Sequence, residues 1–143
     1  WRFYWIWGVI LAKGFAVGIT EYKEIAEKLG SHEVFGGADA DLLRASNILP
    51  NEAVHVYDID NAARFETYVF YGNPGSGVIA VNGAAAKLVE VGDKVIIVSF
   101  GYLSQNELGK HVAKVVVADE NNGIEQILTY PSMIDQTETA DTP

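Results

Sequence analysis

Five consecutive residues with little side chain interrupt two apolar runs of this chain, Asn82-Gly83-Ala84-Ala85-Ala86. Leucine or isoleucine would fill a hydrophobic core better than these residues do. Small residues instead allow another molecule to approach the backbone closely. Arg64 precedes this segment, and its planar guanidinium suits a bidentate grip on a carboxylate. The residue types alone therefore allow a binding module that holds a small carboxylate against the segment 82–86.

Other chemistries find less support. The chain has no cysteine, which excludes disulfides, thiolate metal sites and cysteine nucleophiles. The three histidines, His32, His55 and His111, show no metal-ligand spacing, and we expect no metal site. No serine has a histidine at motif spacing and Gly-x-Ser-x-Gly does not occur, which disfavours a serine hydrolase. Asp58 and Asp60 lie beside an expected turn, and we expect their carboxylates to be solvated.

The charge of the chain limits its partners. The 143 residues carry a formal net charge of −9, which argues against nucleic acid and anionic membrane surfaces but not against a small acidic substrate. The aromatic-rich start, WRFYWIWGVILA, is too short before Lys13 to span a bilayer and lacks a cleavage pattern. We therefore expect an initial strand there and, by default, a cytoplasmic protein.

Short apolar runs separated by turn residues predict a mainly β fold, a small β-barrel with short helices. The expected strands are 9–20 (as one or two strands), 52–60, 64–72, 78–83, 91–103, 112–118 and 124–130.

Helical periodicity and cap residues predict the remaining elements. Helices are expected at 21–30 and 39–50, the second capped by Asp39 or Asp41 and ended by Asn47, with a helical turn after Gly83. We expect one barrel domain over 1–131, with 1–8 as a candidate extension of it. An acidic, disordered tail at 132–143 would follow.

From Asp39 onward the chain resembles a known family. The matching segments are DADLLRASNILPNEAVHVYDIDNAARFETY, the turn GSG, and VIAVNGAAAKLVEVGDKVIIVSF, within residues 39–103. Their most specific parts are RFETY (64–68) and VNGAAA (81–86). These segments resemble aspartate 1-decarboxylase, a pyruvoyl enzyme that makes β-alanine for pantothenate. The resemblance implies a double-psi β-barrel that assembles as a homotetramer with active sites between subunits.

The resemblance also implies the chemistry. In that family a serine becomes a covalent pyruvoyl group through self-cleavage of the chain, so the enzyme is made as a zymogen. The ketone forms a Schiff base with the amino group of L-aspartate, and loss of the α-carboxylate moves electrons into this sink. A proton donor then protonates the carbanion.

The family's roles carry over residue by residue. Tyr68 matches the proton donor, and Thr67 matches a residue that contacts substrate and assists cleavage. Arg64 matches a carboxylate-binding arginine. Lys13, in KGFAVGIT, matches a lysine that faces the substrate. The remaining matched positions are the polar neighbour Asn82 and the backbone cradle of Gly83, Ala84 and Ala85.

The pyruvoyl serine is where the pattern departs. Counting back at the family's spacing from Asp41 reaches Val34-Phe35, and neither side chain has a hydroxyl group that could become a pyruvoyl group. The nearby Gly-Ser pair is Gly30-Ser31, which requires inserted residues both behind it and in front of it. Two readings follow: Ser31 is the pyruvoyl precursor, with or without a maturation factor, or the chain is a non-cleaving homologue that keeps the pocket without the activity.

Overall fold

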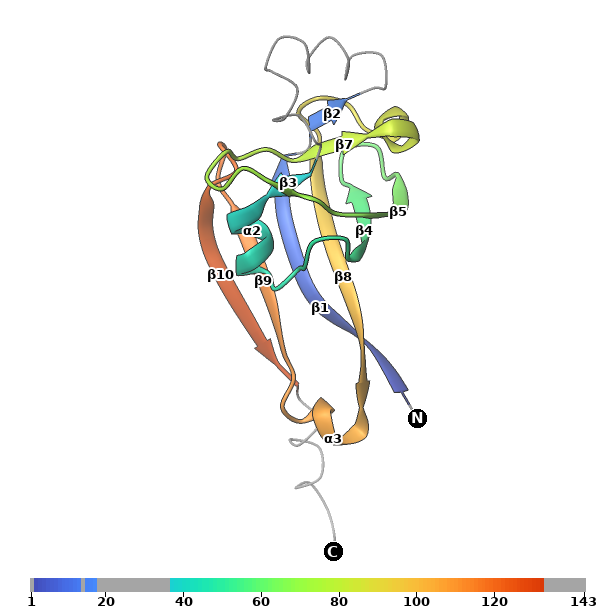
Figure 1. Ribbon diagram of the computed structural model, residues 1–143, viewed down its shortest axis with the longest axis vertical. Coiled ribbons are helices and arrows are strands. Elements are labelled where there is room, and N and C mark those ends of the chain that lie inside the picture. Colours follow the sequence, from blue (N-terminus) through green and yellow to red (C-terminus); the bar gives the residue numbers. More distant parts are fainter. Residues whose placement is uncertain (1, 14, 18–36, 133–143) are drawn as a thin grey trace, which may run out of the picture.

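The computed structural model describes the backbone of residues 2–13, 15–17 and 37–132, and the side chains of 37–132 (Figure 1). Strands dominate these residues, which confirms the mainly β prediction. Closure of the strands into a double-psi barrel stays a prediction. Ser31, the helix expected at 21–30 and the tail after Ser132 lie outside the described residues. In the part of the chain that is described, no helix is long and apolar enough to cross a membrane.

Six strands form the largest sheet, in the order β10-β9-β1-β8-β4-β5 (Figure 1). Their bounds are β1 (Arg2–Lys13), β4 (Ala53–Asp58), β5 (Arg64–Tyr68), β8 (Lys94–Ser104), β9 (Val112–Ala118) and β10 (Ile124–Pro131). β1 pairs antiparallel with β8 along its whole length and parallel with β9. β5 pairs only with β4 among the described strands, so it forms one edge of this sheet.

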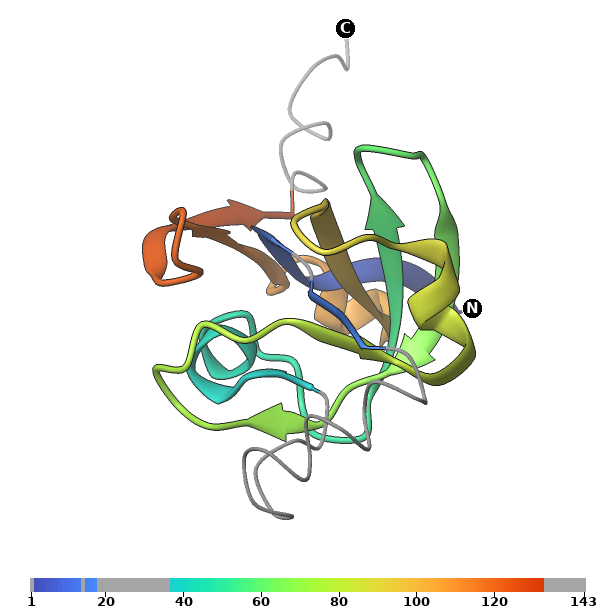
Figure 2. The same ribbon diagram turned by 90° about the horizontal axis from the view of Figure 1, so that it is seen from above.

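Two short parallel ladders join distant parts of the chain. β2 (Phe15–Val17) pairs with β7 (Ala80–Asn82), and β3 (Ala38–Asp39) pairs with β6 (Tyr71–Gly72). Seen from above, β3 and the helix α2 (Ala40–Ala45) lie to one side of the long strands (Figure 2). Both ladders therefore join a segment that precedes α2 in the sequence to a segment that follows β5.

The single strand expected at 64–72 is wrong, because the chain changes partner partway along it. As far as Tyr68 it pairs with β4. The Phe70 carbonyl then accepts a hydrogen bond from the Ala38 N–H at 3.1 Å, and Tyr71 pairs with Ala38 in the second ladder. Val69, between the two pairings, is buried in the core.

The helix predicted at 39–50 is confirmed in its capping but is shorter. Asp39 is the N-cap, and its Oδ1 accepts a hydrogen bond from the Asp41 N–H at 2.8 Å. After α2 the chain reverses at Asn47, whose φ is +63°. The predicted helical turn is the 3₁₀ helix η1 (Gly83–Leu88).

The short helix α3 (Gln105–Leu108) was not predicted. It begins with a reciprocal capping box, in which Ser104 and Glu107 satisfy each other's backbone N–H groups. The sequence Ser-Gln-Asn-Glu carries this signal. The other predicted strands all occur, with β7 the most shortened.

The hydrophobic core lies between the long strands and the segments that carry the two short ladders. Its largest fully buried apolar side chains are Leu42 and Leu43 from α2, Ile48 after it, Val54 from β4, Val95 from β8 and Val116 from β9.

Candidate functional site

A pocket of about 420 Å³ opens beside the edge strand β5 and the small-residue segment. Its apolar floor comes from Val54 and Val56 of β4 and from Val95 and Ile97 of β8. The remaining lining residues are Gly37, Ala38, Glu66, Thr67, Tyr68, Val69, Phe70, Ile79, Ala80, Val81, Asn82, Gly83, Ala84 and Ala85. Six residues expected at the site therefore meet in one cavity, although they come from two separate segments.

The small-residue segment enters the pocket at the end of β7. Gly83 has φ +66°, a left-handed conformation that glycine adopts without strain. A Cβ on Gly83 would meet no atom within 4 Å, so the conformation, and not crowding within the chain, requires glycine there. Open space beside Gly83, Ala84 and Ala85 is what the sequence predicted for a backbone that a ligand approaches.

Tyr68 and Thr67 reach the pocket from β5. In the pairing with β4, Thr67 lies opposite Val54 and Tyr68 opposite Ala53. The Tyr68 side chain is 60% exposed, and its ring meets the Phe70 ring edge-on, with centroids 5.2 Å apart. The phenol is therefore held by an aromatic contact at the cavity rim while it remains accessible.

Arg64 does not line this pocket. It lies at the far end of β5, opposite Tyr57, and its guanidinium carbon lies 5.0 Å from the centroid of the Tyr57 ring. Strand alternation puts Arg64 on the same face of β5 as Tyr68, about 13 Å away along the strand. Within one chain, the predicted carboxylate-binding arginine and the predicted proton donor are therefore separated.

Lys13 and Ser31 cannot be placed as side chains. The Lys13 backbone ends β1, opposite Lys94, and its side chain lies outside the described residues, as does all of Ser31. The backbone that follows Lys13 forms β2, which pairs with the pocket-lining strand β7. The chain around Lys13 thus runs next to the pocket.

The other twelve lining residues were not predicted as part of the site, among them Gly37, Ala38, Glu66 and Phe70. Glu66 could have been found, because it lies two residues before Tyr68 on the same strand and therefore on the same face. A Cβ on Gly37 would lie only 2.2 Å from the Phe70 carbonyl oxygen, so the backbones are in close contact there. Consecutive glycines at 36 and 37 were the available signal for such an approach.

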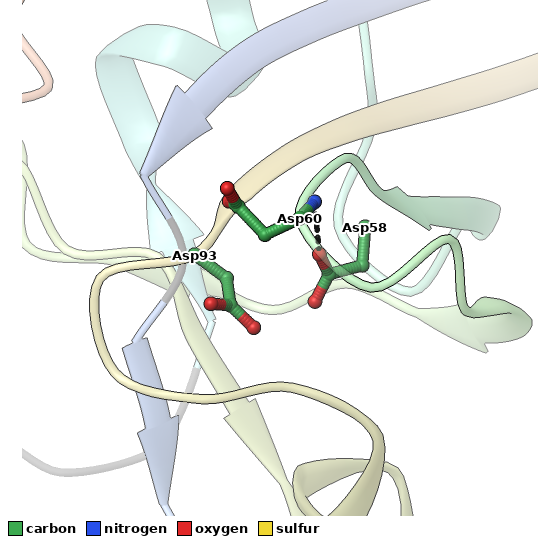
Figure 3. Close-up of side chains that lie close together, drawn as sticks. All are labelled: Asp58, Asp60 and Asp93. Atoms are coloured by element: carbon green, nitrogen blue, oxygen red, sulfur yellow. Dashed lines mark hydrogen bonds between the residues drawn. The ribbon is translucent and has the colours of Figure 1, made fainter.

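Asp58, Asp60 and Asp93 form an acidic cluster between β4 and β8, each offering an oxygen within 4.8 Å of the others (Figure 3). The expectation that Asp58 is solvated is wrong: it is 3% exposed. Its Oδ1 accepts hydrogen bonds from the N–H groups of Asp60 at 2.8 Å and Asn61 at 3.2 Å. Carboxylate oxygens are ligands for hard cations, but here each carboxylate also accepts a hydrogen bond from a backbone N–H: Asp60 accepts from Lys94 and Asp93 from Glu90.

The electrostatics of the cluster act on Asp93. The Glu90 N–H donates to its Oδ2 at 2.7 Å, which alone lowers the pKa of the carboxyl group. Desolvation and the neighbouring Asp58 and Asp60 carboxylates act in the opposite direction. Together they leave the pKa of Asp93 above its ordinary value.

Comparison with known proteins gives one consistent result. The family model described as aspartate decarboxylase matches residues 17–125. The aspartate 1-decarboxylase of Listeria welshimeri is 53% identical over 90 residues, which are 63% of this chain and 71% of that protein. That of Neisseria meningitidis is 51% identical over 92 residues (64% and 72%), and that of Bacillus subtilis 51% over 90 residues (63% and 71%). The chain therefore belongs to the aspartate decarboxylase family.

Proposed function

We propose that this chain catalyses the pyruvoyl-dependent decarboxylation of L-aspartate to β-alanine and CO₂, which feeds pantothenate and coenzyme A synthesis. The observation that carries the proposal is the shared lining of one pocket by residues that the family resemblance assigns to substrate and proton transfer. These are Thr67, Tyr68, Asn82, Gly83, Ala84 and Ala85. Relatives named aspartate 1-decarboxylase support the same activity.

The pocket also suits a reactive group made from the chain itself. After the gap at 18–36 the described chain resumes at Gly37, which lines the pocket, and Ser31 stands six residues before it in the sequence. Fully extended, the backbone from Ser31 to Gly37 would span about 20 Å. A pyruvoyl group derived from Ser31 would accept the electron pair that the bond to the departing carboxylate leaves behind.

The chain's own residues would divide the remaining work. The accessible phenol of Tyr68 would return a proton to the carbon that loses CO₂. The backbone of Gly83, Ala84 and Ala85 lines the pocket and would hold the substrate, as the family resemblance implies. Asn82, exposed at the pocket, offers an amide beside them. The four apolar side chains of the floor offer no polar group that would hold water beside the reacting carbon.

The separation of Arg64 from the pocket supports an assembly in which neighbouring subunits complete each site. β5 lies at the edge of the sheet, and both Arg64 and Tyr68 are exposed on it. In a homotetramer with sites between subunits, Arg64 of one copy would bind the carboxylate of a substrate held by another. Lys13 would face the same substrate.

A non-cleaving homologue is the second candidate function. It is favoured by one observation, that the family's spacing puts Val34-Phe35 where the Gly-Ser pair belongs. In that case the pocket would hold a small carboxylate without chemistry.

Release of CO₂ from L-aspartate by the purified chain tests the proposal. L-glutamate, one methylene longer, is the matched substrate control. Release from aspartate alone, together with labelling of the protein by a ketone reagent, is expected. Binding of aspartate without CO₂ release or labelling would favour the second function.

A further inference from the structure

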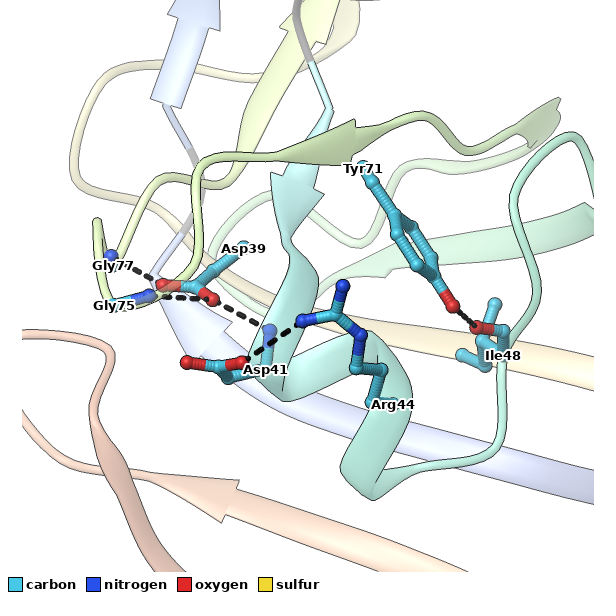
Figure 4. A network of polar contacts seen from close by, with 7 residues as sticks. All are labelled: Asp39, Asp41, Arg44, Ile48, Tyr71, Gly75 and Gly77. Carbon is cyan, nitrogen blue, oxygen red and sulfur yellow. Dashed lines mark hydrogen bonds and ion pairs between the residues drawn. The ribbon is translucent and has the colours of Figure 1, made fainter.

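We propose that Asp39 is a positioning residue for the pocket, because its buried carboxylate ties the turn at 73–77 to the segment that lines the pocket edge. Asp39 is 2% exposed, and Figure 4 shows its carboxylate between the start of α2 and the glycines of that turn. The inference rests on the proposed function only in taking this pocket as the substrate site.

The carboxylate is satisfied by backbone N–H groups from two segments. Oδ1 accepts from Asp41 at 2.8 Å and from Gly75 at 3.2 Å, and Oδ2 accepts from Gly77 at 2.7 Å (Figure 4). A buried carboxylate is costly unless such bonds compensate for lost water. Capping α2 needs only the first bond, so the other two call for a separate explanation.

The two bonds to the turn act on the pocket edge. The arms of the turn hold the segment 37–39 on both sides: the Ala38 N–H donates to Phe70, the Asp39 N–H to Val78 at 2.7 Å, and the Ala80 N–H to Gly37 at 3.0 Å. Phe70 and Ala80, one on each arm, line the pocket with Gly37 and Ala38. By fixing the turn that joins the two arms, the Asp39 carboxylate also fixes Phe70 and Ala80, which lie on either side of the segment 37–39 at the pocket edge.

A second turn supports this clamp from outside. The Asn122 Nδ2 donates to the Gly77 carbonyl at 2.7 Å, and a Cβ on Gly77 would lie 2.3 Å from the Asn121 carbonyl oxygen. At Gly77 the turn is therefore held by Asp39 through its N–H and packed against residues 121–122, so this end of the turn has little room to relax.

Asp39→Asn is the direct test, since it keeps the shape but replaces one acceptor oxygen by an amide nitrogen. That nitrogen cannot accept from Gly77 or, in the other orientation of the amide, from Asp41 and Gly75. Asp39→Ser is the second variant, because serine still caps a helix but is too short to hold the turn. Asp41→Asn is the matched control, an exposed acid on the same helix whose side chain, among the described residues, pairs with Arg44. The probe is succinate, an unreactive dicarboxylate of aspartate's length.

We expect the Kd for succinate to rise at least tenfold in both Asp39 variants, with chemical shifts of a folded chain, and to stay within twofold of the parent in Asp41→Asn. Unchanged affinity in Asp39→Asn or Asp39→Ser, with faster amide exchange at Gly75 and Gly77, would overturn the positioning role.

Amide exchange in the unmodified chain tests the same coupling without any substitution. If Asp39 joins the turn to the pocket edge, the amides of Gly77, Ala38 and Ala80 open together, with one common protection factor. Opening of Gly77 alone, at least tenfold more often than Ala38 and Ala80, would contradict it. Failure of the parent chain to bind succinate would count against the proposed function, whereas the exchange result would still decide the role of Asp39.

Discussion

The Tyr68 ring meets the Phe70 ring edge-on, with centroids 5.2 Å apart and planes at 87°, at the rim of the pocket. Such aromatic pairs fix the orientation of a ring more firmly than area burial alone does. The contact uses the ring of Tyr68 and not its hydroxyl group, so the two contributions can be separated by substitution.

Tyr68→Phe therefore tests the proton donor with the aromatic contact kept. We expect turnover of aspartate to fall about 10²- to 10⁴-fold, the usual worth of a general acid, while self-cleavage continues. Steady-state CO₂ release and the mass of the purified chain measure the two effects. Phe70→Leu, which removes the partner ring only, is the control. Normal turnover in Tyr68→Phe would remove this residue from the mechanism.

Adjacent alanines on η1 give a matched pair for the shape of the pocket. Ala85 lines the cavity and Ala86 does not. Ala85→Leu should fill the space and weaken aspartate binding at least tenfold, and Ala86→Leu should leave it near the parent value. Calorimetric titration measures both. Equal effects of the two substitutions would show that the small residues serve the fold and not a ligand.

Gly37→Ala tests the close approach at the pocket edge. The added Cβ would lie 2.2 Å from the Phe70 carbonyl oxygen, and backbone atoms cannot move aside cheaply. We expect a loss of about 1–3 kcal/mol in the free energy of unfolding, as for other overpacked sites. Gly75→Ala is the control, because a Cβ there meets no atom within 4 Å and only its positive φ is strained. Denaturant unfolding that gives Gly37→Ala the smaller loss would contradict the packing described.

The acidic cluster predicts a pH dependence of stability. The pKa of Asp93 is raised, so the folded chain binds that proton more tightly than the unfolded chain does. This group therefore favours folding as the pH falls towards its ordinary pKa and opposes folding at neutral pH. Asp93→Asn should raise the denaturation midpoint at neutral pH, and the gain should disappear on acidification. Asp119→Asn, at a turn capped by its own carboxylate, is the control. A gain that is independent of pH would contradict the electrostatic cause.

Arg64→Ala should weaken aspartate binding, although Arg64 does not line the pocket of its own chain. Mixing Arg64→Ala subunits with Tyr68→Phe subunits tests whether the arginine acts across an interface. Some mixed assemblies would then contain a site with both residues intact, and activity should return on mixing. Unchanged aspartate affinity in Arg64→Ala would count against its role.

The motifs of the site could be read from the sequence because each is a short continuous segment. RFETY contains Thr67 and Tyr68, which the family resemblance identified, and small residues mark the backbone at Gly83. The break after Tyr68 was missed because it depends on β3, a partner far away in the chain. Periodicity within 64–72 contains no information about that partner.

The burial of Asp58 was missed for a related reason. A carboxylate beside a turn is usually solvated, but here the turn's own N–H groups surround it as donors. Whether such a carboxylate is buried depends on which backbone N–H groups donate to it in the folded chain, and composition does not provide this information. The crowding at Gly37 likewise depends on the position of Phe70.

The mass of the purified, matured chain tests the central claim most directly. If Ser31 is the pyruvoyl precursor, mass spectrometry should find fragments 1–30 and 31–143, the second reactive towards a ketone reagent, and Ser31→Ala should remain a single uncut chain. A single intact chain of 143 residues in the unmodified protein, unlabelled by the reagent, would contradict it.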